Sequence, residues 1–159
     1  IQSTIAANEG RMRSWAQRIS SHLGGSIDGV KIAQLGLSFK ANTDDVRASP
    51  AMLLARSLIA RSVDLCVYDP EGAQNALQEE PDLKIALSAL ACAKDAQALV
   101  IATEWPEFSQ IDLVHLRKSM RGDWIFDLRG VFDSTAVTEA GFIHYRVGHE
   151  IAYPDRLKP

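Results

Sequence analysis

The sequence has 159 residues, with 17 basic and 20 acidic side chains and a net charge of −3. That length suits one domain with a substantial buried core, and the nearly balanced charge excludes the broad basic field typical of nucleic-acid-binding proteins. No apolar stretch is long enough to span a bilayer, and no signal segment opens the sequence. We therefore expect a cytoplasmic protein that has neither a nucleic acid nor a membrane as its partner.

The chain opens inside an amphipathic pattern, without a capped helix start. We expect a fragment of a longer protein whose first helix ends near Gly24 and Gly25. The apolar residues of this pattern recur mostly at steps of three, four or seven, which places them on one stripe. The stripe either covers the chain's own domain or forms the seam of a dimer. Its members are Ile1, Ile5, Met12, Trp15, Ile19 and Leu23.

Strand-like and helix-like segments alternate after this helix. The strands are expected at residues 30–35, 65–68, 98–102, 124–126 and 143–145. The helical connections are expected at residues 51–61, 72–92 with an interruption at Pro81, 113–120 and 134–140. Alternation of this kind predicts a doubly wound, Rossmann-like α/β fold with about five parallel strands and helices on both faces. Residues 26–150 would form this domain, and residues 151–159 a loose tail.

The loop that follows the first strand carries two cations, Lys40 and Arg47, to the start of the next helix. Ser49 can cap that helix and Pro50 suits its first turn. Open α/β folds bind phosphorylated ligands where such strands end and helices begin. The two cations could equally form surface ion pairs with acidic residues of the same loop, which contribute little energy.

Polar residues also follow the other strands, and the carboxyl ends of parallel strands share one edge of the sheet. Asp69 follows the second strand, residues 103–106 the third, and Asp127 and Arg129 the fourth. Cations, acids and an aromatic side chain would meet there, which suits diphosphate oxygens together with hydroxyl groups. Asp69 holds the position of a ribose-binding acid, but only Gly36 follows the first strand. We therefore do not expect NAD to bind through the usual glycine loop.

The two cysteines, Cys66 and Cys92, form neither a disulfide framework nor a metal-binding spacing. We expect no metal, and two reduced thiols in the packed interior. Cys66 lies in the middle of a predicted strand, where burial raises a thiol pKa and makes the residue a poor nucleophile. The four histidines share no spacing and are expected at the surface or in packing roles.

Four motifs together resemble the C-terminal domain of the UDP-glucose/GDP-mannose dehydrogenase family. They are GLSFKANTDDVRASP at residues 36–50, VYDP at 67–70, ATEWPEF at 102–108 and FDLR at 126–129. The TEW stretch is more similar to the UDP-glucose branch than to the GDP-mannose branch. Residues 7–9 resemble the end of the long helix that joins the two domains of this family and builds its dimer, so residues 1–25 would be the C-terminal part of that helix.

The resemblance implies a four-electron oxidation of the C6 alcohol of a nucleotide sugar, with UDP-glucose converted to UDP-glucuronate by two NAD molecules in turn. Phe39 and Lys40 match family positions that contact the sugar nucleotide, and Arg129 matches a substrate-binding arginine. Arg47 matches an arginine that reaches NAD held mainly by the N-terminal domain. The implied partners are a UDP-sugar, that N-terminal NAD-binding domain and a second copy bound through the first helix.

The family's glycine fingerprint and the loop with its nucleophilic cysteine have no counterpart in this sequence, so we expect no catalytic residue and no dehydrogenase activity from the isolated chain. Two positions depart from the family pattern. Ala48 replaces a usual glutamate, and Leu128 replaces a frequent glycine, which would change the Arg129 loop if that position needed a positive φ. The alternative function is a non-catalytic ligand-binding or dimerisation module with the same fold.

Overall fold

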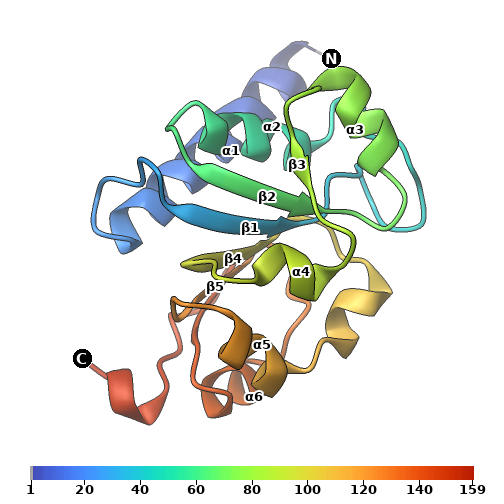
Figure 1. Ribbon diagram of the computed structural model, residues 1–159. Helices are drawn as coiled ribbons and strands as arrows, with labels where there is room; N and C mark the ends of the chain where they lie inside the picture. Colours follow the sequence, from blue (N-terminus) through green and yellow to red (C-terminus); the bar gives the residue numbers. More distant parts are fainter. Residues whose placement is uncertain (1) are drawn as a thin grey trace.

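The computed structural model describes residues 2–159, apart from the side chains of residues 2–6 and 8. Its centre is a six-stranded sheet in the order β3-β2-β1-β4-β5-β6, with all neighbouring strands parallel (Figure 1). The strands are β1 (Lys31–Leu35), β2 (Asp64–Tyr68), β3 (Lys84–Ile85), β4 (Ala98–Ile101), β5 (Trp124–Asp127) and β6 (Ile143–Arg146). The expected doubly wound α/β fold is confirmed.

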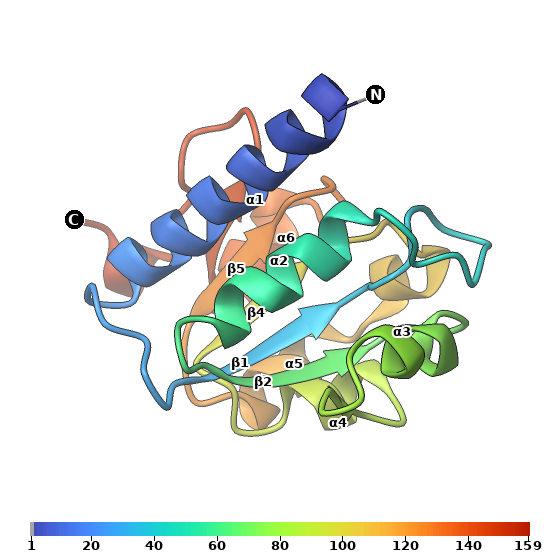
Figure 2. The same ribbon diagram turned by 90° about the horizontal axis from the view of Figure 1, so that it is seen from above.

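Helices cover both faces of the sheet, and each face has its own apolar core (Figures 1 and 2). One face carries α1 (Gln2–His22), α2 (Pro50–Ile59) and α3 (Ala73–Glu79). The opposite face carries α4 (Ala89–Ala93), α5 (Leu113–Ser119) and α6 (Ser134–Glu139). Two short 3-10 helices, Pro106–Gln110 and Asp155–Leu157, complete the described elements. None of the helices described here is both long and apolar enough to cross a membrane.

The strand order reverses at β1, which pairs with β2 on one side and with β4 on the other. The connections from these strands therefore leave in opposite directions and open a crevice at the carboxyl ends of the strands, where folds of this class bind ligands. Ser49 begins α2 beside this edge, because its side chain accepts a hydrogen bond from the N–H of Ala51 and Pro50 occupies the first turn. The predicted helix start is thus confirmed.

Strand β3 was not expected, and it divides the predicted helical stretch 72–92 into α3, a two-residue strand and α4. It pairs with Cys66 and Val67 at the edge of the sheet. Two residues are too few to give an alternating pattern, so the sequence held no signal for this strand. The sheet has six strands rather than about five for this reason.

Helix α1 packs its apolar stripe against the domain's own core. Met12, Trp15 and Ile19 are buried there, and the Trp15 ring lies 5.3 Å from the ring of Tyr145 in β6. This part of the stripe faces the sheet, and Figure 2 shows α1 lying over the domain beside α2, with its N-terminal end projecting beyond it. Ile1 and the side chain of Ile5, which belong to the same predicted stripe, lie outside the described residues.

The last residues are packed rather than loose. His144 and Ala152 exchange two backbone hydrogen bonds of 2.8 and 3.0 Å, and Pro154 is buried. Arg156 then donates to the carbonyl of Gly141 at 2.9 Å and to the carboxylate of Asp123 at 3.1 Å. These contacts are long-range in sequence, so the absence of local periodicity in the tail did not reveal them.

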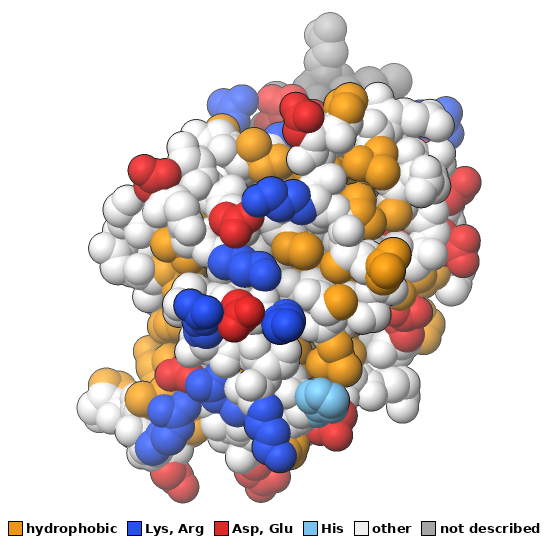
Figure 3. Space-filling view, viewed as in Figure 1, with side chains coloured by type: hydrophobic (Ala, Val, Ile, Leu, Met, Phe, Trp, Pro, Cys, Tyr) orange, Lys and Arg blue, Asp and Glu red, His pale blue; other side chains and the backbone are white. Residues whose placement is uncertain are grey.

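The surface carries charges of both signs, in agreement with the nearly balanced composition. Basic side chains gather near the middle of the face shown in Figure 3, with acidic side chains among them. Ion pairs occur at the amino ends of the strands, where Lys84 lies 2.5 Å from Asp64 and Arg121 lies 3.2 Å from Asp95. Such exposed pairs contribute little to stability.

Candidate functional site

The loop between β1 and α2, residues 36–49, is fixed by one buried carboxylate. Asp69, which follows β2, accepts six hydrogen bonds. Its donors are the N–H groups of Leu37, Ser38, Glu71 and Gly72, the hydroxyl of Ser38 and the indole of Trp105. Burial opposes ionisation of Asp69, but the backbone hydrogen bonds outweigh it and lower the pKa of this carboxyl. A charged Asp69 therefore joins the segments that follow β1, β2 and β4.

Gly36 allows the loops after β1 and β4 to touch. Its φ of 99° lies in the region that favours glycine, and a Cβ atom there would come within 2.5 Å of the Thr103 side chain. The Thr103 hydroxyl meanwhile donates to the carbonyl of Ser38 at 2.9 Å. A side chain at position 36 would therefore push apart two loops that the rest of the edge holds together.

Phe39 and Lys40 project from this fixed loop toward solvent. The Phe39 side chain is 53% exposed, although its own N–H is anchored on the carbonyl of Asp45 at 2.8 Å. Lys40 is exposed, and its ammonium group has neither a hydrogen-bond nor an ion-pair partner among the side chains that the structure describes. The loop fixed by Asp69 therefore presents an exposed aromatic ring and a cation at adjacent positions.

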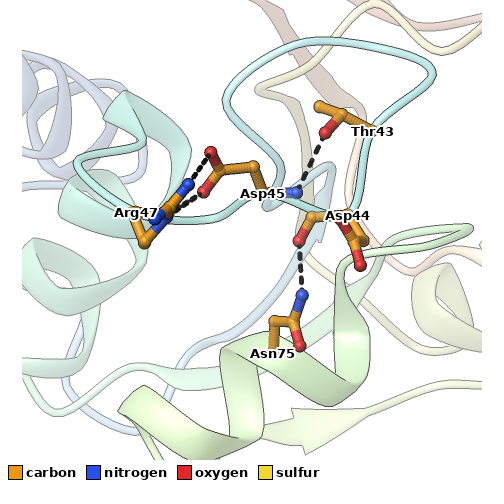
Figure 4. Close-up of polar contacts among 5 residues, drawn as sticks. All are labelled: Thr43, Asp44, Asp45, Arg47 and Asn75. Atoms are coloured by element: carbon orange, nitrogen blue, oxygen red, sulfur yellow. Dashed lines mark hydrogen bonds and ion pairs between the residues drawn. The ribbon is translucent and has the colours of Figure 1, made fainter.

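Arg47 belongs to the same loop but is already paired (Figure 4). Its guanidinium forms two hydrogen bonds of 2.9 Å with the carboxylate of Asp45, and this contact lowers the pKa of Asp45 to about 2. Asn75 of α3 donates to the carbonyl of Asp44 at 3.0 Å and fastens the far side of the loop. The Arg47 side chain remains 85% exposed, so a ligand anion could still compete for it.

Arg129, after β5, is also engaged with an acid. Its guanidinium contacts the carboxylate of Glu104, which follows β4, and the hydrogen bond lowers the pKa of Glu104. Arg129 also lines a hollow of about 160 Å³, together with Trp15 of α1, Ala51 of α2 and Ala102. The arginine therefore lies where the loops after β4 and β5 meet the start of α2.

A second buried aspartate holds the Arg129 loop. Asp127 accepts hydrogen bonds from the N–H of Arg129 at 3.1 Å and of Phe132 at 2.9 Å. His144 Nε2 lies 3.4 Å from Asp127 Oδ2, and His144 Nδ1 lies 2.8 Å from the hydroxyl of Ser134. Burial opposes ionisation of Asp127, but the contacts with His144 and the backbone lower its pKa.

The departure at Leu128 leaves the backbone of this loop in ordinary conformations. The positive φ falls on Gly130, at 68°, while Leu128 is not among the described residues with positive φ. The Arg146 guanidinium lies 3.0 Å from where a Cβ of Gly130 would stand. Ala48, the other departure, is exposed and has a φ of 52°.

The edge does not fit a dinucleotide bound in the usual way. Such a ligand needs free N–H groups after the first strand and a free acid after the second. The N–H groups of Leu37 and Ser38 instead point at Asp69, and Asp69 has its acceptor positions filled. No cluster of His, Cys, Asp and Glu side chains suited to a metal occurs in the described part of the chain.

Residues 33–134 match a family model described as the UDP binding domain of the UDP-glucose/GDP-mannose dehydrogenase family. The chain belongs to this family. The UDP-glucose 6-dehydrogenase of Rhizobium meliloti is 38% identical over 148 residues, which cover 93% of this chain and 34% of that protein. The enzyme of the same name from Rickettsia prowazekii is 36% identical over 153 residues and is covered to 35%. The chain thus spans about a third of the length of these curated relatives.

Solved structures of the dehydrogenase family share the fold. UDP-D-ManNAc dehydrogenase from Pyrococcus horikoshii aligns with a TM-score of 0.67 and 30% identity over 87% of this chain and 31% of that one. UDP-glucose dehydrogenase from Pyrobaculum islandicum aligns with a TM-score of 0.64 and 29% identity over 74% of this chain and 26% of that one. The resemblance inferred from the four motifs is therefore confirmed at the level of the family and of its UDP binding domain.

Within this dehydrogenase-family domain, the sequence predicted the loops correctly but missed what holds them. The loops after β1, β2, β4 and β5 do meet, through Asp69, Thr103 and the Arg129–Glu104 pair. Lys40, Arg47 and Arg129 do not converge on one group among the described residues, because the two arginines are each paired with a different acid. The buried roles of Asp69 and Asp127 went unrecognised, although Asp69 directly follows β2 and Asp127 ends β5, each within a quoted motif.

Proposed function

We propose that this chain is the C-terminal, sugar-nucleotide-binding domain of an NAD-dependent nucleotide-sugar 6-dehydrogenase that converts UDP-glucose to UDP-glucuronate in its full length. The observation that carries the proposal is the fixed loop at the carboxyl edge, with its exposed Phe39 and its Lys40. Membership of the family and the names of the relatives support the choice of a UDP-sugar.

Each of the three substrate-binding residues has a physical role in this proposal. The Lys40 ammonium is a compact cation for the diphosphate oxygens, and it gives up no protein partner within the described residues. Phe39 offers an aromatic surface to the sugar or the base. Arg129 would exchange Glu104 for an oxygen of the ligand, which suits its forked donors.

NAD is proposed as the cofactor of the full-length protein, held mainly by an N-terminal domain. Arg47 is the residue of this chain that we assign to it, because its side chain is 85% exposed and, among the described residues, is paired with Asp45 alone. When bound, NAD would accept hydride from the substrate. The chain alone would then lack dehydrogenase activity, and turnover of NAD with UDP-glucose by a clean preparation would contradict this.

Titration of the isotope-labelled chain with UDP-glucose, followed by NMR, tests the proposed site. We expect shifts that cluster at Phe39, Lys40 and Arg129, and weaker shifts with GDP-mannose. Lys40→Gln should weaken binding about tenfold, because it removes a charge-assisted contact. Lys118→Gln is the matched control, since Lys118 is an exposed lysine in the last turn of α5.

Shifts that avoid the carboxyl edge, or equal binding by the Lys40→Gln variant, would contradict the assignment of these residues. A chain that binds neither ligand would contradict the proposed binding by the isolated domain and would favour the dimerisation module among the alternatives. Sequence upstream of residue 1 separates the enzyme from a non-catalytic module, since a glycine fingerprint and a cysteine-bearing loop there would support the enzyme.

A homodimer through the first helix is also part of this proposal. It would have to use the exposed face of α1, since Met12, Trp15 and Ile19 are buried within the domain. Sedimentation over a range of concentrations tests it, and a strict monomer at high concentration would contradict a dimer built by this chain alone. A cytoplasmic location is proposed as well, with the two free thiols in support.

A further inference from the structure

The two cysteines of the chain lie against each other on the face of the sheet that α4 covers. Cys66 is the middle residue of β2, and Cys92 belongs to α4. The Cys92 sulfur lies 3.2 Å from the carbonyl oxygen of Cys66 and 3.8 Å from that of Gln34 in β1. The side chains of the two cysteines also interact, and this contact lowers the pKa of Cys66. Residues 26 positions apart in the sequence are thus in direct contact.

Small side chains bring α4 close enough for this contact. Ala33 is the neighbour of Cys66 in register on β1 and is fully buried. Helix α4 has the sequence ALACA, so Ala93 follows Cys92 at the same interface. A helix with alanine at this interface can approach a strand closely.

The two sulfurs differ in their access to solvent. Cys92 is fully buried, whereas Cys66 is half-buried next to the two-residue edge strand β3. A small oxidant can therefore reach Cys66 from the edge of the sheet, whereas Cys92 is buried and not accessible to it. A partly exposed thiol next to a buried one is the arrangement of an attacking and a resolving cysteine.

The surroundings favour the thiolate of Cys66. Its pKa is lowered to about 7, first because the Cys92 thiol donates a hydrogen bond to it, while partial burial opposes the effect. Lys31 and Lys84, at the starts of β1 and β3, lower it further, and Asp64 between them raises it. The same contact and burial raise the pKa of Cys92. Burial does act to raise the pKa of Cys66, as expected, but the contact with Cys92 outweighs it, so the expected net increase is wrong.

We propose that Cys66 and Cys92 form a peroxide-reactive pair that closes to an intrachain disulfide. The Cys66 thiolate attacks one oxygen of hydrogen peroxide, so that an S–O bond forms, the O–O bond breaks and hydroxide leaves as water. The Cys66 sulfur is thereby oxidised to a sulfenic acid. Cys92 then loses its proton and attacks this sulfur; the S–S bond forms and a second water leaves. In total, two thiols and one peroxide give one disulfide and two waters.

Hydrogen peroxide, added in slight excess to the chain at pH 8, tests the proposal. We expect loss of both free thiols per chain and a tryptic peptide pair linked between Cys66 and Cys92, both reversed by dithiothreitol. The rate of thiol loss should rise with pH through a midpoint of about 7, which is the pKa of Cys66.

Two variants of Cys92 separate its two roles. Cys92→Ala should stop at a Cys66 sulfenic acid that dimedone traps, and its midpoint should move up toward the ordinary value of about 8.5. Cys92→Ser should also stop at the sulfenic acid but keep the lower midpoint, because a hydroxyl still donates to the thiolate. In Cys66→Ala, the remaining buried thiol of Cys92 should react with peroxide at least tenfold more slowly than the wild-type chain does.

The proposal is overturned if the wild-type chain keeps both thiols under these conditions, or if the linked peptides come from two different chains. It is also overturned if Cys66 of the wild-type chain proceeds to the sulfinic acid as fast as in Cys92→Ala. The wild-type peptide map decides the question even if the alanine variants fail to fold.

Discussion

The loop after β1 and the loop after β5 each carry a cation at the carboxyl edge of the sheet, and each depends on a buried aspartate. Asp69 accepts three of its six hydrogen bonds from a loop more than 30 residues away in sequence, whereas Asp127 holds the residues that follow it directly. The first loop presents Lys40 without a partner in the described structure, and the second presents Arg129 already paired with Glu104.

How firmly the backbone of a loop is held and whether its cation is available to a ligand are separate properties of the two loops. Both aspartates fix a backbone by satisfying N–H groups that would otherwise be buried without partners. A ligand must displace Glu104 before it can use Arg129, whereas it can use Lys40 without displacing a carboxylate of the described residues. We therefore expect the Asp69 loop to dominate stability and initial binding, and the Arg129 loop to adjust affinity.

Asp69→Ala should have the largest effect on stability of all these substitutions. The substitution leaves several buried donors without an acceptor, and we expect the free energy of unfolding to fall by about 4 kcal/mol. Urea denaturation followed by circular dichroism measures this. Asp82→Ala, at an exposed position, is the control and should change stability by less than about 0.5 kcal/mol. Equal stability of the two variants would show that Asp69 does not fix the loop.

Asp127→Asn should lower the free energy of unfolding by about 2 kcal/mol near neutral pH. This difference from the wild type should depend on pH. The pKa of Asp127 is lowered in the folded chain, so its contribution is fully present above the unfolded pKa of about 3.9 and is lost as the pH falls through the folded value. Urea denaturation at pH 7 and at steps below pH 4 should therefore bring the two curves together on the acidic side. A difference that stays constant would exclude the charge of Asp127 as its cause.

Two glycines allow a matched test of the two loops. Gly36→Ala requires a positive φ of 99° and places a Cβ within 2.5 Å of Thr103, so we expect a loss of about 2 kcal/mol. Gly130→Ala requires a φ of 68° but meets only the end of the Arg146 side chain at 3.0 Å, and should cost about 1 kcal/mol. Thermal unfolding of both variants gives the order, and a reversed order would mean that the β1 and β4 loops can separate at little cost.

The smallest effect is expected from Glu104→Gln. This pair is part-exposed, so its loss should change stability by no more than about 0.5 kcal/mol. The freed Arg129 should bind the diphosphate of UDP-glucose roughly threefold more tightly, since no carboxylate competes for it. Calorimetric titration checks this, and weaker binding would indicate that Glu104 helps to orient Arg129 instead.

Most of the fold could be predicted from local signals. The strands at residues 31–35, 98–101 and 124–127 appear as apolar runs, and α2 begins at the predicted cap. Strand β3 and the packed tail were missed, because two residues give no period and the tail is held by contacts with β6. Periodicity reports only what a segment buries, so elements fixed by a distant partner leave no local pattern.

The candidate site likewise has parts that the sequence predicted and parts that it did not. Sequence patterns were enough to predict the family, most of the elements and the positions of Phe39, Lys40 and Arg129 after the strands. Only the folded chain shows that Asp69 binds the backbone rather than a ribose, that Arg129 faces Glu104 and that Cys66 contacts Cys92. Hydrogen bonds and pKa values depend on groups that are distant in sequence and close in space, and only the folded sheet brings those groups together.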